Sequence, residues 1–279
     1  MSEIIFCKTR HFYESYTDFW KLVEFSNFKT IYVDEINIEE EGVYISAPLN
    51  GEWVHIENQI KDKKRRRAHL IHWNIERPAG SAGSVHYYAE RQWQLMSDRL
   101  ADEIWVSDSQ LADETGLRFV ILGSDEGLGQ PSDDKIYDFC HMSALVPLRT
   151  GILARFNQDK IGPNCWPPER DEVLKKSRFG LNIHQDIYSY QEPLRFALFA
   201  AYGLPIVSQS LINSYPYSDE YMITAVYPNL VGKLKQLLSE DYSKYRDMGL
   251  RTRDRMTGEF QFKSMVEKAI KESVGRWRV

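Results

Sequence analysis

The stretch from residue 179 to residue 208 constrains the fold of this chain more than any other. It reads Phe-Gly-Leu-Asn-Ile-His-Gln, then a loop, then Glu-Pro-Leu-Arg-Phe-Ala-Leu-Phe-Ala-Ala-Tyr-Gly-Leu-Pro-Ile-Val-Ser. The apolar runs at 181–184 and 204–207 each predict a buried strand. Between them, Glu192 and the proline after it suit the start of a helix, and Gly203 suits the residue just beyond its end. The segment therefore predicts a parallel β-α-β unit.

Three polar side chains of this unit fall where open α/β sheets bind ligands. His184 ends the first strand, and Glu192 and Arg195 lie at the start of the helix. Ligands of such sheets bind at the carboxyl ends of the strands, beside helix N-termini that favour anions. We therefore expect this edge to hold a phosphate-bearing ligand. Two interpretations of His184 stay open, namely contact with the ligand or a strand-end histidine bonded to the backbone.

The alternation of strands and helices extends over the whole chain. The first half predicts strands at 4–7, 30–33, 42–46, 69–73, 103–107 and 119–122, and helices at 13–25, 53–66 and 87–100. The second half predicts further strands at 136–140 and 221–226, helices at 148–156, 168–176 and 230–238, and two amphipathic helices between 242 and 277. This pattern predicts an α/β protein with two Rossmann-like, doubly wound parallel-sheet domains and a central cleft.

A segment rich in Gly, Ser, Asp and Pro, at 123–134, separates the two halves. We place the predicted domain boundary within it. Residues 1–125 then form an N-terminal α/β domain, 126–260 a C-terminal α/β domain, and 261–279 a terminal helix.

The order of motifs in the second half resembles the carboxyl-terminal domain of GT-B glycosyltransferases. The similarity is to the glycosyl transferases group 1 type and their CgeB-like relatives, and it rests on Leu-Asn-Ile-His, Glu-Pro-Leu-Arg and Gly-Leu-Pro-Ile-Val-Ser. In that family the corresponding segment holds a nucleotide sugar. The resemblance implies that the C-terminal domain binds the donor, that the N-terminal domain presents the acceptor, and that the terminal helix crosses back to the first domain.

Four residues are the candidates for donor binding. Arg149 lies just inside a predicted helix after the strand that ends near residue 140, where a guanidinium can meet a phosphate. The resemblance adds Arg195 for the phosphates, with His184 and Glu192 beside it. Surface or interdomain ion pairs are the alternative for both arginines.

The chain departs from the family at one point of the donor site. Many retaining members carry two glutamates separated by seven residues, and counting back from Gly203 places these positions at Leu198 and Tyr190. Only Glu192 is present, two positions away from the nearer one. The way the ribose is held, and the retaining mechanism itself, are therefore open.

The acceptor-side candidates follow the strand predicted at 69–73. His72 and Glu76 are suited to orient or deprotonate an acceptor hydroxyl, His72 because the ordinary pKa of histidine lies near neutrality. Asp34 and Glu35, at the end of another predicted strand, are competing candidates. For His72 the alternative is a buried histidine bonded between strands.

The basic run at 61–67 has two interpretations. The sequence Lys-Asp-Lys-Lys-Arg-Arg-Arg suits the solvated end of a helix, where cations complement the dipole. Clustered cations also bind polyanions, and nearby aromatic residues such as Trp73 suit stacking on bases or sugars. An enzyme that glycosylates modified bases in DNA is therefore one alternative function.

Composition excludes several classes of protein. The net charge of −5 argues against a protein that mainly coats nucleic acid, and the 3 cysteines form no CxxC pair. No apolar run approaches the roughly 20 residues of a membrane-spanning helix. We expect a cytoplasmic protein with no membrane span. Because the sequence lacks Walker A, GxGxxG, HExxH, GxSxG and Asp-x-Asp motifs, we expect neither a metal nor a cofactor.

The leading hypothesis is a metal-independent glycosyltransferase of the hexosyltransferase kind. It would move a sugar from a nucleoside diphosphate sugar, its co-substrate, to the hydroxyl of a saccharide, small molecule or nucleic acid in the interdomain cleft. A non-catalytic nucleotide- or sugar-binding protein of the same fold is the first alternative. An epimerase of that fold is another.

Overall fold

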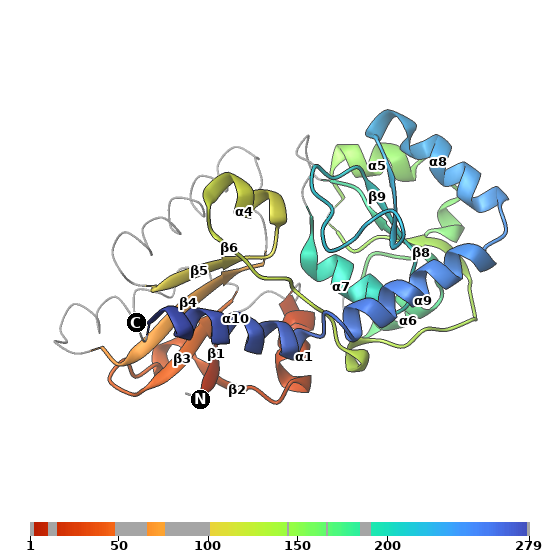
Figure 1. The fold of residues 1–279 in the computed structure, drawn as a ribbon. Helices are drawn as coiled ribbons and strands as arrows, with labels where there is room; N and C mark the ends of the chain where they lie inside the picture. The colour runs from red at the N-terminus through yellow and green to blue at the C-terminus, as the bar shows by residue number, and fades with distance from the viewer. Residues whose placement is uncertain are drawn as a thin grey trace. The chain divides into compact units, whose positions relative to one another are not determined.

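The computed structural model describes residues 3–10, 16–47, 66–75, 101–143, 145–165, 167–184 and 191–277. The chain divides into two compact units, Met1–Val120 and Ile121–Val279. Figure 1 shows that each unit is built on a sheet flanked by helices. The predicted helix at 87–100, and nearly all of the one at 53–66, lie outside the described residues.

The described strands of the first unit lie close to their predicted positions. Its elements are β1 (Ile4–Lys8), α1 (Thr17–Phe25), β2 (Lys29–Tyr32), the 3-10 turn η2 (Val33–Glu35), β3 (Gly42–Ser46), β4 (Ala68–Asn74), β5 (Glu103–Val106), α4 (Ser109–Thr115) and β6 (Arg118–Phe119). The strands form one sheet in the order β2-β1-β3-β4-β5-β6, and every pairing is parallel. The strand order reverses between β1 and β3, the arrangement of a doubly wound sheet. The predicted strand at 119–122 is shorter than expected, and α4 was not predicted.

An aromatic cluster fills the core of this unit. The rings of Phe19, Trp73 and Trp105 are buried and meet edge to face. The indole of Trp73 donates a hydrogen bond to Ser107 Oγ at 2.8 Å, and Ser107 in turn donates to the carbonyl of Val120. Trp73 is therefore a core residue and is not available to stack on a ligand.

The second unit repeats the alternation. Its elements are η3 (Glu126–Leu128), β7 (Tyr137–Cys140), α5 (Pro147–Leu153), η4 (Gln158–Lys160), α6 (Glu169–Lys175), β8 (Ser177–Asn182), α7 (Pro193–Ala201), β9 (Ile206–Gln209), β10 (Met222–Ala225), α8 (Tyr227–Ser239), α9 (Ser243–Thr257) and α10 (Phe262–Trp277). The strands pair in parallel in the order β10-β9-β8-β7. The two parallel sheets confirm the predicted fold class.

The side chains of β8 alternate between two different helix layers. Phe179, Leu181 and Ile183 belong to a core that also contains apolar residues of α5 and α8. On the other face, Gly180 lies so close to α7 that a Cβ there would come within 2.5 Å of the Phe199 ring. Because side chains of a strand alternate, Asn182 points to the α7 side. This alternation places the polar end of β8 beside the start of α7.

The helix α7 is buried along almost its whole length. Residues 196–201 are all buried, as expected for a helix that is apolar on every face. The helix begins after Glu192 and ends at Tyr202, with Gly203 beyond it at a φ of +63°. Both ends lie where the sequence predicts them.

The C-terminal helix α10 belongs to the second compact unit. Phe262 and Val266 on this helix are fully buried, and the Phe262 amide donates to the carbonyl of Ser124. Its packing on the first domain stays a prediction. No helix among the described residues is long and apolar enough to span a lipid bilayer.

The contact between Gly180 and Phe199 leads to a prediction on stability. Gly180→Ala should lower the free energy of unfolding by about 1–3 kcal/mol, because the added methyl group overpacks the interface of β8 with α7. Gly232→Ala in α8 is the matched control, since no atom lies within 4 Å of its added Cβ. The control should be neutral, or stabilising by about 0.5–1 kcal/mol. Urea denaturation of both variants measures the difference, and equal effects would contradict the assigned packing.

Candidate functional site

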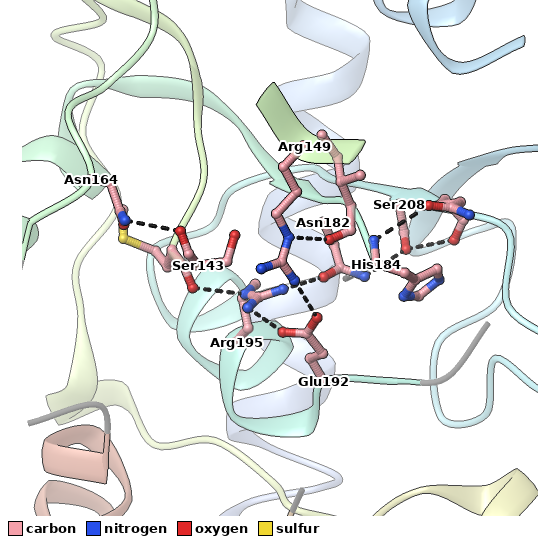
Figure 2. Close-up of polar contacts among 11 residues, drawn as sticks. Ser143, Arg149, Asn164, Asn182, His184, Glu192, Arg195 and Ser208 are labelled. Atoms are coloured by element: carbon pink, nitrogen blue, oxygen red, sulfur yellow. Dashed lines mark hydrogen bonds and ion pairs between the residues drawn. The ribbon is translucent and has the colours of Figure 1, made fainter. Parts of the chain in front are cut away.

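Three elements of the second unit meet at the carboxyl end of β8. Arg149 comes from the first turn of α5, Asn182 ends β8, and Glu192 and Arg195 come from the start of α7 (Figure 2). Both helices begin with a proline in the first turn, which suits that position because its nitrogen has no hydrogen to leave unpaired. The sequence-predicted donor residues are therefore brought to one edge of the sheet.

Arg149 crosses this edge from one helix layer to the other. Its Nε donates to the carbonyl of Ile183 at 2.7 Å, and its Nη2 lies 3.4 Å from Glu192 Oε1. The residue is only 3% exposed. Hydrogen bonds of a charged group in such a setting are worth about 1.5–3 kcal/mol each. Arg149 thus holds the strand end and the start of α7 together.

Arg195 makes a denser set of contacts. Its Nη1 donates to Asn182 Oδ1 at 2.5 Å, its Nε donates to the carbonyl of Met142 at 3.1 Å, and its Nη2 forms an ion pair with Glu192. Neither arginine is a surface residue, since their side chains are 4% and 12% exposed. The bond to Met142 joins α7 to the segment that follows β7.

One carboxylate is shared by the two arginines. Oε1 of Glu192 faces Arg149 and Oε2 faces Arg195. Two guanidinium charges against one carboxylate leave a net charge of +1 on these three side chains. Guanidinium groups gathered in this way suit the recognition of an anion such as a phosphate.

A chain of neutral polar groups continues from the ion pairs toward β9. Asn182 Nδ2 donates to Ser208 Oγ at 3.0 Å, and Ser208 donates to the carbonyl of Gln209. The Oε1 of Gln209 accepts from the backbone amide of His184 at 3.3 Å. His184 itself is fully buried two residues beyond the end of β8. These contacts fix the amides and hydroxyls at the strand ends.

The comparisons with known proteins support this fold and leave the substrate open. No family model matches the sequence, and no curated protein matches it. The crystal structure of Anabaena HepE in complex with UDP and glucose is similar, with a TM-score of 0.61 and 11% identity over 98% of this chain and 100% of HepE. The structure of TarM is similar with a TM-score of 0.58 and 10% identity, over 82% of this chain but only 54% of TarM.

The fold is that of the GT-B glycosyltransferases. The similarity to HepE extends over nearly the whole chain, so it includes both parallel sheets. At 10–11% identity it concerns the fold alone. The finer resemblance to the group 1 and CgeB-like types stays a prediction.

Sequence reasoning missed two residues of this edge. Asn182 bonds to Arg195, and His141 follows directly after β7, where it is only 5% exposed. The rule that polar residues at strand ends line ligand sites, applied above to His184, would have selected both. Asn182 follows Leu181 and His141 follows Cys140, so each comes directly after an apolar residue of a predicted strand.

The acceptor-side candidates are only partly described. Glu76 lies outside the described residues. His72 lies on β4, 5% exposed, with its Nδ1 3.3 Å from Ser46 Oγ on β3. Burial lowers the pKa of His72 to about 4, so the ring is neutral at pH 7. Its role as a base stays a prediction, as does that of Asp34 and Glu35, both of which pair with Arg10.

The described end of the basic run is engaged in ion pairs. Arg66 pairs with Asp102, and Arg67 pairs with Glu41 at 3.3 Å. The rest of the run lies outside the described residues. Among the described residues, no group of three or more His, Cys, Asp or Glu side chains could hold a metal ion.

The shared carboxylate leads to a prediction on stability. Glu192→Gln should lower the free energy of unfolding by about 1.5–3 kcal/mol, because two buried guanidinium groups would lose their common counter-charge. Glu172→Gln, which loses pairs with Lys175 and Lys176 at a site where Glu172 is 58% exposed, is the control and should change stability by no more than about 0.5 kcal/mol. Chemical denaturation measures both. Similar small losses would show that Glu192 does not hold the arginines.

The burial of His72 leads to a prediction on pH dependence. Its pKa of about 4 in the folded protein lies below the ordinary histidine value of 6.5, so the unfolded chain binds more protons between these values. Stability should therefore be full above pH 6.5 and fall toward pH 4, by up to about 3 kcal/mol. His72→Asn should flatten this part of the profile, as measured by calorimetry from pH 4 to 7.5. An unchanged profile would contradict the buried, neutral histidine.

Proposed function

We propose that this protein is a glycosyltransferase that moves a sugar from a nucleoside diphosphate sugar to an acceptor hydroxyl. The donor diphosphate would bind at the carboxyl edge of β8, beside Arg149 and Arg195. The observation that carries the proposal is the meeting of two guanidinium groups at Glu192, beside the carboxyl end of β8. A GT-B neighbour whose structure holds UDP and glucose agrees with it.

The chemistry of the transfer requires positive charge at this place. When the glycosidic bond to the diphosphate breaks, negative charge develops on the departing oxygen. Preorganised cationic donors stabilise that charge without reorganising during the reaction. Guanidinium groups suit the task because their planar forks match phosphate oxygens. The network that fixes Arg195 to Asn182 and Met142 supplies such preorganisation.

A panel of nucleotides tests the donor site directly. UDP, GDP, ADP, CMP and dTDP, with their common sugars, are added to the protein and the melting temperature is recorded. A ligand at 100 times its dissociation constant stabilises by about 2.7 kcal/mol, which is a readily measured shift. We expect one nucleotide and its sugar conjugate to stabilise the chain. No shift with any of them would overturn the proposed function.

A second candidate function is a binding protein of the same fold that does not turn over. One observation favours it. Leu198, at the position where many retaining family members carry a glutamate, is 2% exposed within α7, so no carboxylate stands there. Slow hydrolysis of the sugar conjugate is expected of a transferase and not of a binding protein. It is monitored through the release of free sugar. Binding with no hydrolysis and no transfer to added acceptors would favour the binding protein.

The donor site leads to a prediction on affinity. Arg149→Ala should weaken binding of the stabilising nucleoside diphosphate by about 1.5–3 kcal/mol, because a charged hydrogen bond to phosphate is lost. Arg178→Ala is the control, because Arg178 lies near the amino end of β8, away from the candidate site, and pairs with Asp138. Calorimetric titration is carried out well below the melting temperatures of both variants, so that a loss of folding is not mistaken for a loss of affinity. Unchanged affinity in the Arg149 variant would remove this residue from the site.

A further inference from the structure

His141 occupies a position at this edge that the sequence motifs do not explain. It directly follows β7, the strand that pairs with β8, and it is buried, with only 5% of its surface exposed. The residues after it are held from two sides. Arg195 donates to the carbonyl of Met142 at 3.1 Å, and Asn164 donates to the carbonyl of Ser143 at 2.9 Å (Figure 2). The backbone that carries His141 is therefore fixed.

The Nδ1 atom of His141 is buried, and within the described part of the chain it has no hydrogen-bond partner. A buried polar atom in this state costs about 1–3 kcal/mol. Native proteins keep few such atoms, and those they keep call for an explanation. A ligand atom at the same edge would supply the missing partner.

The charges around His141 oppose its protonation in the empty site. Burial, together with the positive charges of Arg195 on α7 and Arg149 on α5, lowers its pKa to about 4. Glu192 carries the opposing charge and is bonded to both arginines. His184, after β8, is the other histidine at this edge in the described residues.

We propose that His141 is a further ligand-binding residue, whose Nδ1 donates to the diphosphate and which takes up a proton from solvent when the ligand binds. This inference rests on the proposed function of the site. An anion bound to the arginines offsets their repulsion of a charged ring, and its attraction opposes the cost of burying that charge. In the bound state Arg149, Arg195 and His141 are all cationic. The charge on His141 is present only while the ligand is bound.

The linkage has a definite sign. In the complex the pKa of His141 rises, whereas in the empty site it stays at about 4. Affinity therefore increases as the pH falls through the pKa of the complex, and it levels off near the pKa of the free protein. From pH 7.5 to 5.5 we expect about a 5- to 10-fold decrease in the dissociation constant.

The experiment is a calorimetric titration of the whole chain with UDP-glucose from pH 5.5 to 7.5, in buffers of different ionisation enthalpy. UDP-glucose is the probe because its diphosphate has no terminal phosphate, a group whose second pKa lies near 6. If the nucleotide panel selects another base, the corresponding nucleoside diphosphate sugar replaces it. His141→Asn keeps a hydrogen-bonding amide near the position of Nδ1 but does not titrate. His69→Asn on β4, a histidine outside the candidate site, is the matched control.

Tighter binding at pH 5.5 with proton uptake in the wild-type protein and in His69→Asn, together with a flat profile in His141→Asn, supports the inference. Binding that is independent of pH in the wild-type protein overturns it and leaves the proposed function intact. A wild-type slope in His141→Asn also overturns it. Absence of binding at every pH overturns the proposed function, and this inference with it. Melting temperatures of the unliganded variants identify any loss of folding.

Discussion

The carboxylate of Glu192, shared between Arg149 and Arg195, joins parts of the second unit that the chain connectivity leaves apart. It links α5 to α7, and through Arg195 it reaches the end of β8 and the segment after β7. Without it, two guanidinium charges would face each other at this edge, and like charges repel strongly where solvent screening is weak. The shared carboxylate therefore favours the meeting of these elements, and the geometry of the candidate site depends on it.

The alternation of side chains along β8 supports this arrangement. Apolar residues on one face pack with α5 and α8, and Gly180 lets α7 approach closely on the other. Beyond the last residue of β8, a side chain from the helix layer on one face can reach the layer on the other face. Arg149 does so at the carbonyl of Ile183. The site lies at the strand ends because that is where the two layers become accessible to each other.

The sequence was sufficient for the fold and for the sheet edge at which Arg149, Glu192 and Arg195 gather, but not for their contacts. The helix start after Glu192 and the turn at Gly203 depend on local backbone chemistry, so their positions were predictable. The pairing of Arg149 with Glu192 joins residues 43 positions apart and is set by tertiary packing. His141 was missed because it follows an apolar strand without a motif of its own. The bond between His72 and Ser46 depends on the register of β3 with β4.

The burial of α7 has a consequence for the speed of ligand exchange. The carbonyl of Ala197 accepts from Ser124, that of Ala201 accepts from Arg253, and the helix is surrounded by apolar side chains. A helix held in this way cannot shift along its axis without breaking these bonds, and such collective shifts take microseconds to milliseconds. The side chains at its start are not subject to that barrier, because rotamer changes are much faster. An anion would therefore enter by exchanging partners with Glu192, and the local rate of that exchange would be set by side-chain rotation.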